Sequence, residues 1–235
     1  MTHSTFDTPG TREVHKTTSR SQQATFLPRK RISLKMAVSS LLLGVALTCP
    51  AILFLALFPI SSQTQRNHLE VALFPGIAIA LHVLLGPLLE EVVYRGLFLQ
   101  LARRYLPVWV AIVLSSAVFA ITHLPRGLGT VAIAFAIGCL YAWMVTRSGS
   151  LYPGFLCHSI FNFAAMFIVS PLFGIGEKLL ALSPNTRFPL TEIFPLWWIV
   201  LSLLMALTSF IMLAREFTRR ENVADHGSRL AARVA

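Results

Sequence analysis

The sequence predicts an all-α fold, a polytopic bundle of about six to seven transmembrane helices. Hydrophobic residues make up 55% of the 235 residues and charged residues only 13%, which is not the balance of a soluble domain. Several apolar runs approach or exceed the ~20 residues that cross the hydrocarbon core of a bilayer. These runs cover residues 36–60, 71–89, 108–121, 131–145 and 193–213.

Proline, glycine and charged residues mark where the predicted helices begin and end. The first helix should run over residues 33–60 and bend at Pro50. The stretch 69–105 is too long for one simple crossing and should break at Gly86-Pro87, which gives six crossings if it counts once and seven if it counts twice. Further helices are expected at residues 108–123, 128–146, 151–173 and 196–214.

This pattern divides the chain into five segments. We expect a disordered, basic cytoplasmic tail at 1–32, because its Thr, Ser, Gln and basic residues cannot bury a core. The other segments are an anchor helix and loop at 33–68, a helical core at 69–175, a loop and last membrane helix at 176–214, and a second basic cytoplasmic tail at 215–235.

The positive charge gathers at the two ends of the chain. Of the twenty Lys and Arg residues, seven precede Met36 and five follow Leu213. By the positive-inside rule, both termini of this integral membrane protein should be cytoplasmic, and we expect it in the plasma membrane. The net charge of +10 does not indicate nucleic-acid binding, because no aromatic residues are interleaved with the basic ones.

Ionisable side chains are rare in the predicted core. Between residues 71 and 176 the only acidic residues are Glu90 and Glu91, and the only histidines are His82, His123 and His158. Such groups cost a few kcal/mol each at membrane depth, so their presence indicates a function or a specific packing role. The sequence places only small or apolar residues three or four positions from His82, and we interpret it as a packing or pore-lining residue.

The two glutamates are expected to differ in their partners. In a helix Glu91 and Arg95 lie one turn apart on the same face, where they can form an ion pair. Glu90 lies about 140° around the helix from Arg95, so an ion pair between these two residues is less favourable. Glu90 is therefore the carboxylate available for chemistry, unless the whole cluster is a buried network that packs helices.

Two other predicted helices carry the remaining polar groups. His123 ends the apolar helix before Pro125, whereas His158 and Asn162 share a face of a later helix. Together the three helices offer a general base, an imidazole that positions water and donors for an oxyanion. In straight helices His123 and His158 would lie near opposite membrane faces, so tilted or broken helices must bring them together.

The ordered motifs resemble those of the CPBP family, which includes CAAX-processing endopeptidases, Abi-type membrane proteins and bacteriocin-processing or immunity proteins. The motifs are Glu90-Glu91-x-x-x-Arg95, Phe119-x-x-x-His123 and His158-x-x-x-Asn162. The resemblance implies an intramembrane endopeptidase in which Glu90 and His123 activate a water, while His158 and Asn162 stabilise the oxyanion. Its substrate would be a membrane protein or a membrane-associated peptide, prenylated or carrying a leader.

The resemblance leaves the cofactor open, because family members have been described both as metalloproteases and as glutamate-dependent proteases. Zinc is possible, with Glu90, His123 and His158 as ligands and Glu91 as the base. We favour a mechanism with no obligatory metal, since short spacing between ligands on one helix is missing. The main alternative is a non-catalytic membrane protein that binds a peptide, lipid or partner in an immunity or scaffold role, and a proton or ion transporter comes third.

Overall fold

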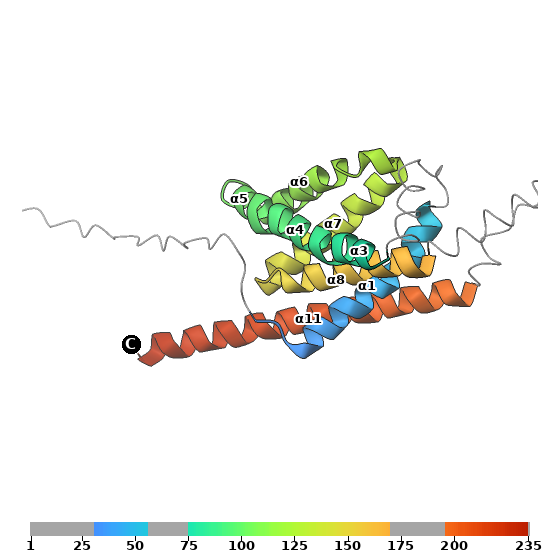
Figure 1. The fold of residues 1–235 in the computed structure, drawn as a ribbon. Coiled ribbons are helices and arrows are strands. Elements are labelled where there is room, and N and C mark those ends of the chain that lie inside the picture. Colours follow the sequence, from blue (N-terminus) through green and yellow to red (C-terminus); the bar gives the residue numbers. More distant parts are fainter. Residues whose placement is uncertain (1–30, 56–74, 170–195, 235) are drawn as a thin grey trace, which may run out of the picture.

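A computed structural model describes residues 31–55, 75–169 and 196–234, and every element in these ranges is a helix (Figure 1). The predicted all-α class is therefore confirmed for the described residues. Residues 1–30, 56–74 and 170–195 lie outside them, and with them most of the expected tail, the two expected loops and the adjoining ends of the expected helices.

Helix α1 (Leu34–Leu55) lies between α8 (Tyr152–Ala164) and α11 (Leu196–Val234) and packs on both (Figure 1). It contains Pro50, as expected. Gly44 allows the contact with α8, since a Cβ at this position would collide with the Ile160 side chain and the Cys157 carbonyl. A small residue at a helix crossing is a common device of membrane proteins, because it lets two backbones approach closely.

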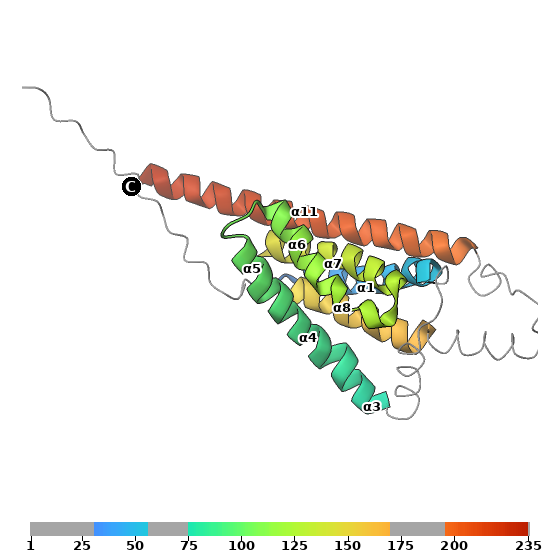
Figure 2. The same ribbon diagram turned by 90° about the horizontal axis from the view of Figure 1, so that it is seen from above.

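Residues 75–102 form one continuous rod in which α-helical and π-helical turns alternate (Figure 2). The expected break at Gly86-Pro87 is therefore wrong. A π-helix accepts hydrogen bonds over five residues, and a Cβ on Gly86 would lie 2.7 Å from the carbonyl oxygen of Leu81, five residues earlier. The widened turn and the bare Cα of Gly86 accommodate the proline without ending the helix. The segments are α3 (Pro75–Ala78), η1 (Ile79–Leu85), α4 (Gly86–Glu90), η2 (Glu91–Phe98) and α5 (Leu99–Ala102).

Helices α6 (Val108–Ile121) and α7 (Leu128–Ser148) form a hairpin whose ends agree with the expected ones to within two residues. The connection contains the short 3₁₀ helix η3 (Leu124–Arg126) and Gly127, whose φ of 100° requires glycine. Gly149 ends α7 in the left-handed conformation typical of a helix C-terminus.

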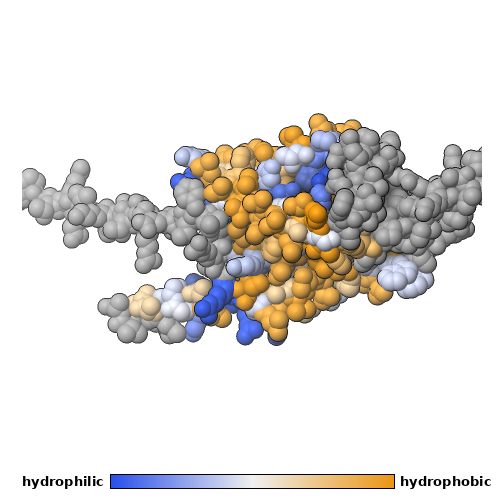
Figure 3. All heavy atoms as spheres, in the orientation of Figure 1, coloured by the Kyte–Doolittle hydropathy of each residue, from blue (hydrophilic) through white to orange (hydrophobic). Residues whose placement is uncertain are grey.

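Three described helices are long and apolar enough to cross a membrane: Leu34–Leu55, Leu128–Ser148 and Trp197–Arg229. The expected six to seven crossings are not supported by the described residues. Helix α6 has only 14 residues, or about 21 Å, against a hydrocarbon core of about 30 Å. The face seen in Figure 3 is largely hydrophobic, which suits contact with lipid. The chain is thus an all-α membrane protein.

The last helix is much longer than expected. Helix α11 continues past residue 214 to Val234, so the predicted separate tail at 215–235 is helical over nearly all its length. Its 39 residues extend about 58 Å, more than a bilayer core requires. The additional turns are fixed to the bundle, because Glu216 accepts a hydrogen bond from Ser33 and Glu221 pairs with Arg147 at 3.0 Å.

Candidate active site

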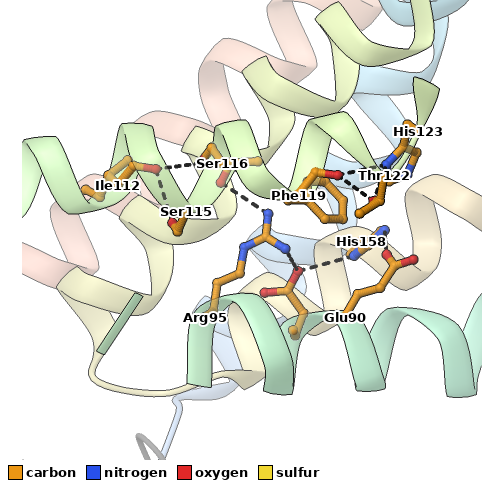
Figure 4. A network of polar contacts seen from close by, with 11 residues as sticks. Glu90, Arg95, Ile112, Ser115, Ser116, Phe119, Thr122, His123 and His158 are labelled. Carbon is orange, nitrogen blue, oxygen red and sulfur yellow. Dashed lines mark hydrogen bonds and ion pairs between the residues drawn. The ribbon is translucent and has the colours of Figure 1, made fainter. Parts of the chain in front are cut away.

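The polar side chains from three helices meet where the rod 75–102 passes α8 and α6 (Figure 4). Glu90 ends α4, Glu91 begins η2, and His158 projects from α8 between the two carboxylates. Helix α6 brings Phe119, whose ring lies edge-on to that of His158 at 5.9 Å between centroids. The structure therefore brings both glutamates and His158 together.

Glu91 and Arg95 form the expected ion pair, with 3.0 Å between Oε1 and Nη1 and no exposed side-chain surface on either residue. The Arg95 guanidinium also donates through Nη2 to the Gly138 carbonyl at 3.3 Å. Its carbon lies 4.3 Å from the centre of the Phe119 ring, a cation–π distance. These contacts hold Glu91 as a fixed part of the core, because moving either charge would leave its partner buried and unpaired.

Glu90 is placed differently from its neighbour. Its side chain is 36% exposed, and Oε2 lies 3.5 Å from Nε2 of His158. Among the described residues no ion pair joins it to Arg95, in agreement with the expected angle between them. Glu90 is thus a carboxylate that a water molecule or a substrate can reach.

His158 is oriented by contacts on every side. Nδ1 lies 3.2 Å from Oε1 of Glu91 and Nε2 faces Glu90, so a protonated Nδ1 donates to the buried carboxylate. The imidazole also stacks on Tyr141, with 4.9 Å between ring centres and 29° between planes. A ring held in this way keeps its Nε2 directed at the exposed side of the site.

His123 joins the site through Phe119 and not by direct contact with Glu90. Its Nδ1 lies 3.1 Å from the Phe119 carbonyl oxygen, and the two rings meet edge to face at 4.8 Å. With the Nδ1 proton donated to that carbonyl, Nε2 is an acceptor for water. Phe119 also contacts His158. Its ring therefore links the two histidines, which straight helices would place near opposite membrane faces.

Asn162 lies one turn after His158 on α8, as expected, but its amide is already engaged. Nδ2 donates to the carbonyl oxygen of His82 at 3.0 Å. Among the described residues no hydrogen bond connects Asn162 to Glu90 or to either histidine of the motifs. One of its two amide protons remains for a further acceptor.

The sequence reasoning missed three residues that shape the site. Tyr141 stacks on His158 and is fully buried, and Gly138 accepts the Arg95 hydrogen bond. A Cβ on Gly154 would lie 3.0 Å from Oε2 of Glu91, so a larger residue there would press on that carboxylate. Tyr141 had a sequence signal: a phenol in the middle of an apolar helix, away from the interface where tyrosine is common.

A zinc site formed by Glu90, His123 and His158 would require the three side chains to converge on one point. Within the described residues no group of three or more His, Cys, Asp or Glu side chains is arranged to hold a metal ion. Glu90 and His158 are neighbours, whereas His123 contacts Phe119 and Thr122. The side chains as placed do not fit the set Glu90, His123 and His158.

The site thus combines a buried carboxylate, a partly exposed carboxylate and two histidines. Residues 72–164 match the family described as Rce1-like, type II CAAX prenyl endopeptidase Rce1-like. All six candidate residues lie inside the matched segment. The match shows that this segment, about two fifths of the chain, is similar to CAAX prenyl endopeptidases. Comparisons with curated proteins and with solved structures gave no match.

Proposed function

We propose that the chain hydrolyses a peptide bond of a membrane-associated substrate, a prenylated or leader peptide or a membrane protein, with Glu90 as general base. The observation that carries this proposal is the difference between the two adjacent glutamates. Glu91 is fully buried and paired with Arg95, whereas Glu90 is 36% exposed beside His158. A general base must reach both a water molecule and the substrate, and only Glu90 has this access.

In the proposed reaction, Glu90 removes a proton from a water held by Nε2 of His123. The water oxygen bonds to the carbonyl carbon of the scissile peptide, and the carbonyl oxygen becomes an oxyanion. Nε2–H of His158 and the second amide proton of Asn162 donate to that oxyanion. When the C–N bond breaks, Glu90 returns its proton to the leaving amine, which completes the hydrolysis.

Arg95 and Glu91 act in this scheme by positioning. Their buried pair fixes Nδ1 of His158, so that Nε2 stays directed at the reacting carbonyl. Glu91 is poorly suited to be the base, because removing its charge would leave Arg95 buried and unpaired.

We propose that no metal is obligatory. A water next to a carboxylate and an imidazole can be activated by proton transfer alone. The proposal also draws on the contacts of the donors, since among the described residues Glu90 and His158 contact each other, whereas His123 contacts Phe119 and Thr122.

We further propose that both termini are cytoplasmic, in the plasma membrane. Basic residues from three parts of the chain gather at one end of the bundle, where Arg220 donates to the Arg31 carbonyl at 2.6 Å and Arg147 pairs with Glu221. Such a concentration of arginine favours the cytoplasmic side. The count of six to seven crossings stays a proposal.

The alternative function is binding without catalysis, in an immunity or scaffold role. It is favoured by one observation: the Glu91–Arg95–His158 network is buried, as expected of a group that only packs helices.

Cleavage mapping separates the two functions. The full-length protein, reconstituted in phospholipid nanodiscs, is incubated with a farnesylated peptide, and products are identified by mass spectrometry. We expect one cleavage site with the wild type, none with Glu90→Gln, and wild-type cleavage with the control Glu221→Gln, whose carboxylate is 49% exposed on α11. Cleavage that survives in Glu90→Gln, or intact substrate with the wild type across prenylated and leader peptides, contradicts the proposal.

A further inference from the structure

The proline in the middle of the rod 75–102 changes the hydrogen bonding of the turn before it. In the π-helical segment η1 the carbonyl of each residue is directed at the N–H five residues later. The Leu81 carbonyl fits this pattern, because its oxygen would lie 2.7 Å from a Cβ on Gly86. The next carbonyl in the series belongs to His82, and the residue five positions later is Pro87, which has no N–H.

A donor from another helix reaches the His82 carbonyl. Nδ2 of Asn162, on α8, donates to this oxygen at 3.0 Å, although the two residues are 80 positions apart. Because a backbone carbonyl only accepts hydrogen bonds, the contact also determines which way the amide is turned. Nδ2 faces η1, and Oδ1 faces away from that carbonyl. The bond of one amide proton therefore sets the direction of the other.

Pro87 lies where the rod packs against α8. It is fully buried in α4, and both α4 and η1 contact α8. The two polar side chains that α8 brings to the site are each held by the rod. Glu91 holds Nδ1 of His158 at 3.2 Å. One turn further along α8, the His82 carbonyl holds Asn162.

Any residue other than proline at position 87 would bring an N–H that competes with Asn162. A backbone bond to the His82 carbonyl within the helix needs no side chain to be ordered, whereas Asn162 loses rotamer freedom when it makes its contact. A competing N–H would therefore displace the Asn162 amide for part of the time. Proline removes this competitor from the rod.

We propose that Pro87 is a positioning residue of the active site. Because it has no N–H, the His82 carbonyl binds Asn162, and this bond directs the second amide proton of Asn162 at the oxyanion. The inference rests on the proposed peptidase function and deepens it, since Pro87 prepares a residue that donates to the reacting carbonyl. The missing N–H is the property that matters, and the pyrrolidine ring is replaceable.

Two replacements of Pro87 that differ only in the N–H test the proposal. Alanine and lactic acid carry the same methyl group, but lactic acid joins the chain through an ester and has no N–H. In the full-length protein we expect Pro87→Ala to lower kcat about tenfold, with KM within about twofold of the wild type. Lactic acid at position 87 should restore most of the lost kcat. The control Pro50→Ala, which adds an N–H to α1, should keep the wild-type value. Equal losses for alanine and lactic acid would overturn the proposal.

A double-mutant cycle shows whether Pro87 acts through Asn162. Asn162→Ala should lower kcat by about 10²-fold, because it removes a donor to the oxyanion. Adding Pro87→Ala to this variant should lower kcat no further, since the contact that Pro87 protects is already lost. A further loss of about tenfold in the double variant would mean that Pro87 acts by another route, and the proposal would be wrong.

The side-chain amide of Asn162 gives a readout that does not depend on catalysis. In full-length protein labelled with ¹⁵N-asparagine in detergent micelles, its NMR signal is identified by its loss in Asn162→Ala. We expect its hydrogen-bonded proton to resonate downfield of those of Asn222, which is exposed on α11. The signal should move toward that of Asn222 in Pro87→Ala and stay in place in Pro50→Ala.

The same NMR measurement separates this proposal from the peptidase function. If the wild type cleaves no peptide but the Asn162 signal depends on Pro87, the peptidase function fails and the positioning of Asn162 by Pro87 stands. An Asn162 signal that is unchanged in Pro87→Ala would overturn the proposal, whether or not the protein cleaves peptides.

Discussion

Glu91 and His158, which are 67 residues apart in the sequence, meet in the interior of the bundle with 3.2 Å between Oε1 and Nδ1. The same oxygen of Glu91 lies 3.0 Å from Nη1 of Arg95. One carboxylate therefore links the rod 75–102 to α8 and fixes the direction of the imidazole that faces Glu90. Glu91 thus has a structural role, whereas Glu90 remains accessible.

Glu91→Gln should destabilise the protein far more than Glu90→Gln. Removing one charge of a buried pair leaves the other uncompensated, at a cost of about 3–5 kcal/mol, whereas Glu90 is partly exposed. Thermal unfolding in detergent, followed by tryptophan fluorescence, measures the difference. The control Glu221→Gln breaks an exposed pair with Arg147 and should cost less than about 1 kcal/mol. Equal losses for Glu90→Gln and Glu91→Gln would show that the buried pair is not structural.

Tyr141→Phe should fold and cleave nearly as well as the wild type, and Tyr141→Leu should not. The Tyr141 hydroxyl is buried beside the Cys157 thiol, a weak hydrogen-bonding group, so its removal leaves no strongly polar group without a partner. Leucine removes the ring that stacks on His158, and we expect about a tenfold loss in kcat with a smaller change in KM. Steady-state kinetics on purified, folded protein tests this. A large loss with Tyr141→Phe would mean that the hydroxyl has a role the contacts do not reveal.

Gly44→Ala should destabilise the bundle, while Gly76→Ala should not. A Cβ at Gly44 collides with the Cys157 carbonyl on α8, whereas nothing lies within 4 Å of a Cβ at Gly76. Alanine favours a helix over glycine by up to about 1 kcal/mol, so Gly76→Ala should be neutral or slightly stabilising. The melting temperatures of the two variants, measured side by side, test this difference. A similar shift for both would contradict the close contact between α1 and α8.

Exhaustive chelation should leave peptidase activity intact. The reason is the donor arrangement, since no three potential ligands come together in the described part of the chain. Activity is measured after dialysis against a strong chelator, with the bound metal content determined on the same sample. Loss of activity that stoichiometric zinc restores would reverse the assignment and make Glu90 a ligand.

Local patterns predicted those parts of the site that lie within one helix. The Glu91–Arg95 pair follows from i,i+4 spacing, and the separation of Glu90 from Arg95 follows from the turn angle. The meeting of Glu91 with His158 is a tertiary contact, which spacing cannot predict. Tyr141 was missed for the same reason, because its stacking on His158 depends on how α7 packs against α8.

The helix boundaries show where the sequence patterns were insufficient. Gly86-Pro87 is a sequence pattern that usually ends a helix, yet here the helix continues because the π-helical turn of η1 accommodates the proline. The apolar pattern of the sequence does not distinguish a π-helical turn from an α-helical one. Helix α11 was expected to end where hydropathy falls, at about residue 214. Its polar turns continue because Glu216 accepts a hydrogen bond from Ser33, just before α1, and Glu221 forms an ion pair with Arg147 on α7.

The most direct test of the central claim is the single-turnover cleavage rate of Glu90→Gln, measured together with its substrate affinity. Glutamine is nearly isosteric with glutamate but cannot take a proton from water. We predict that the rate constant falls by about 10²–10⁴-fold while the dissociation constant of the peptide changes little. A Glu90→Gln protein that cleaves within about threefold of the wild-type rate would contradict the assignment of Glu90 as general base.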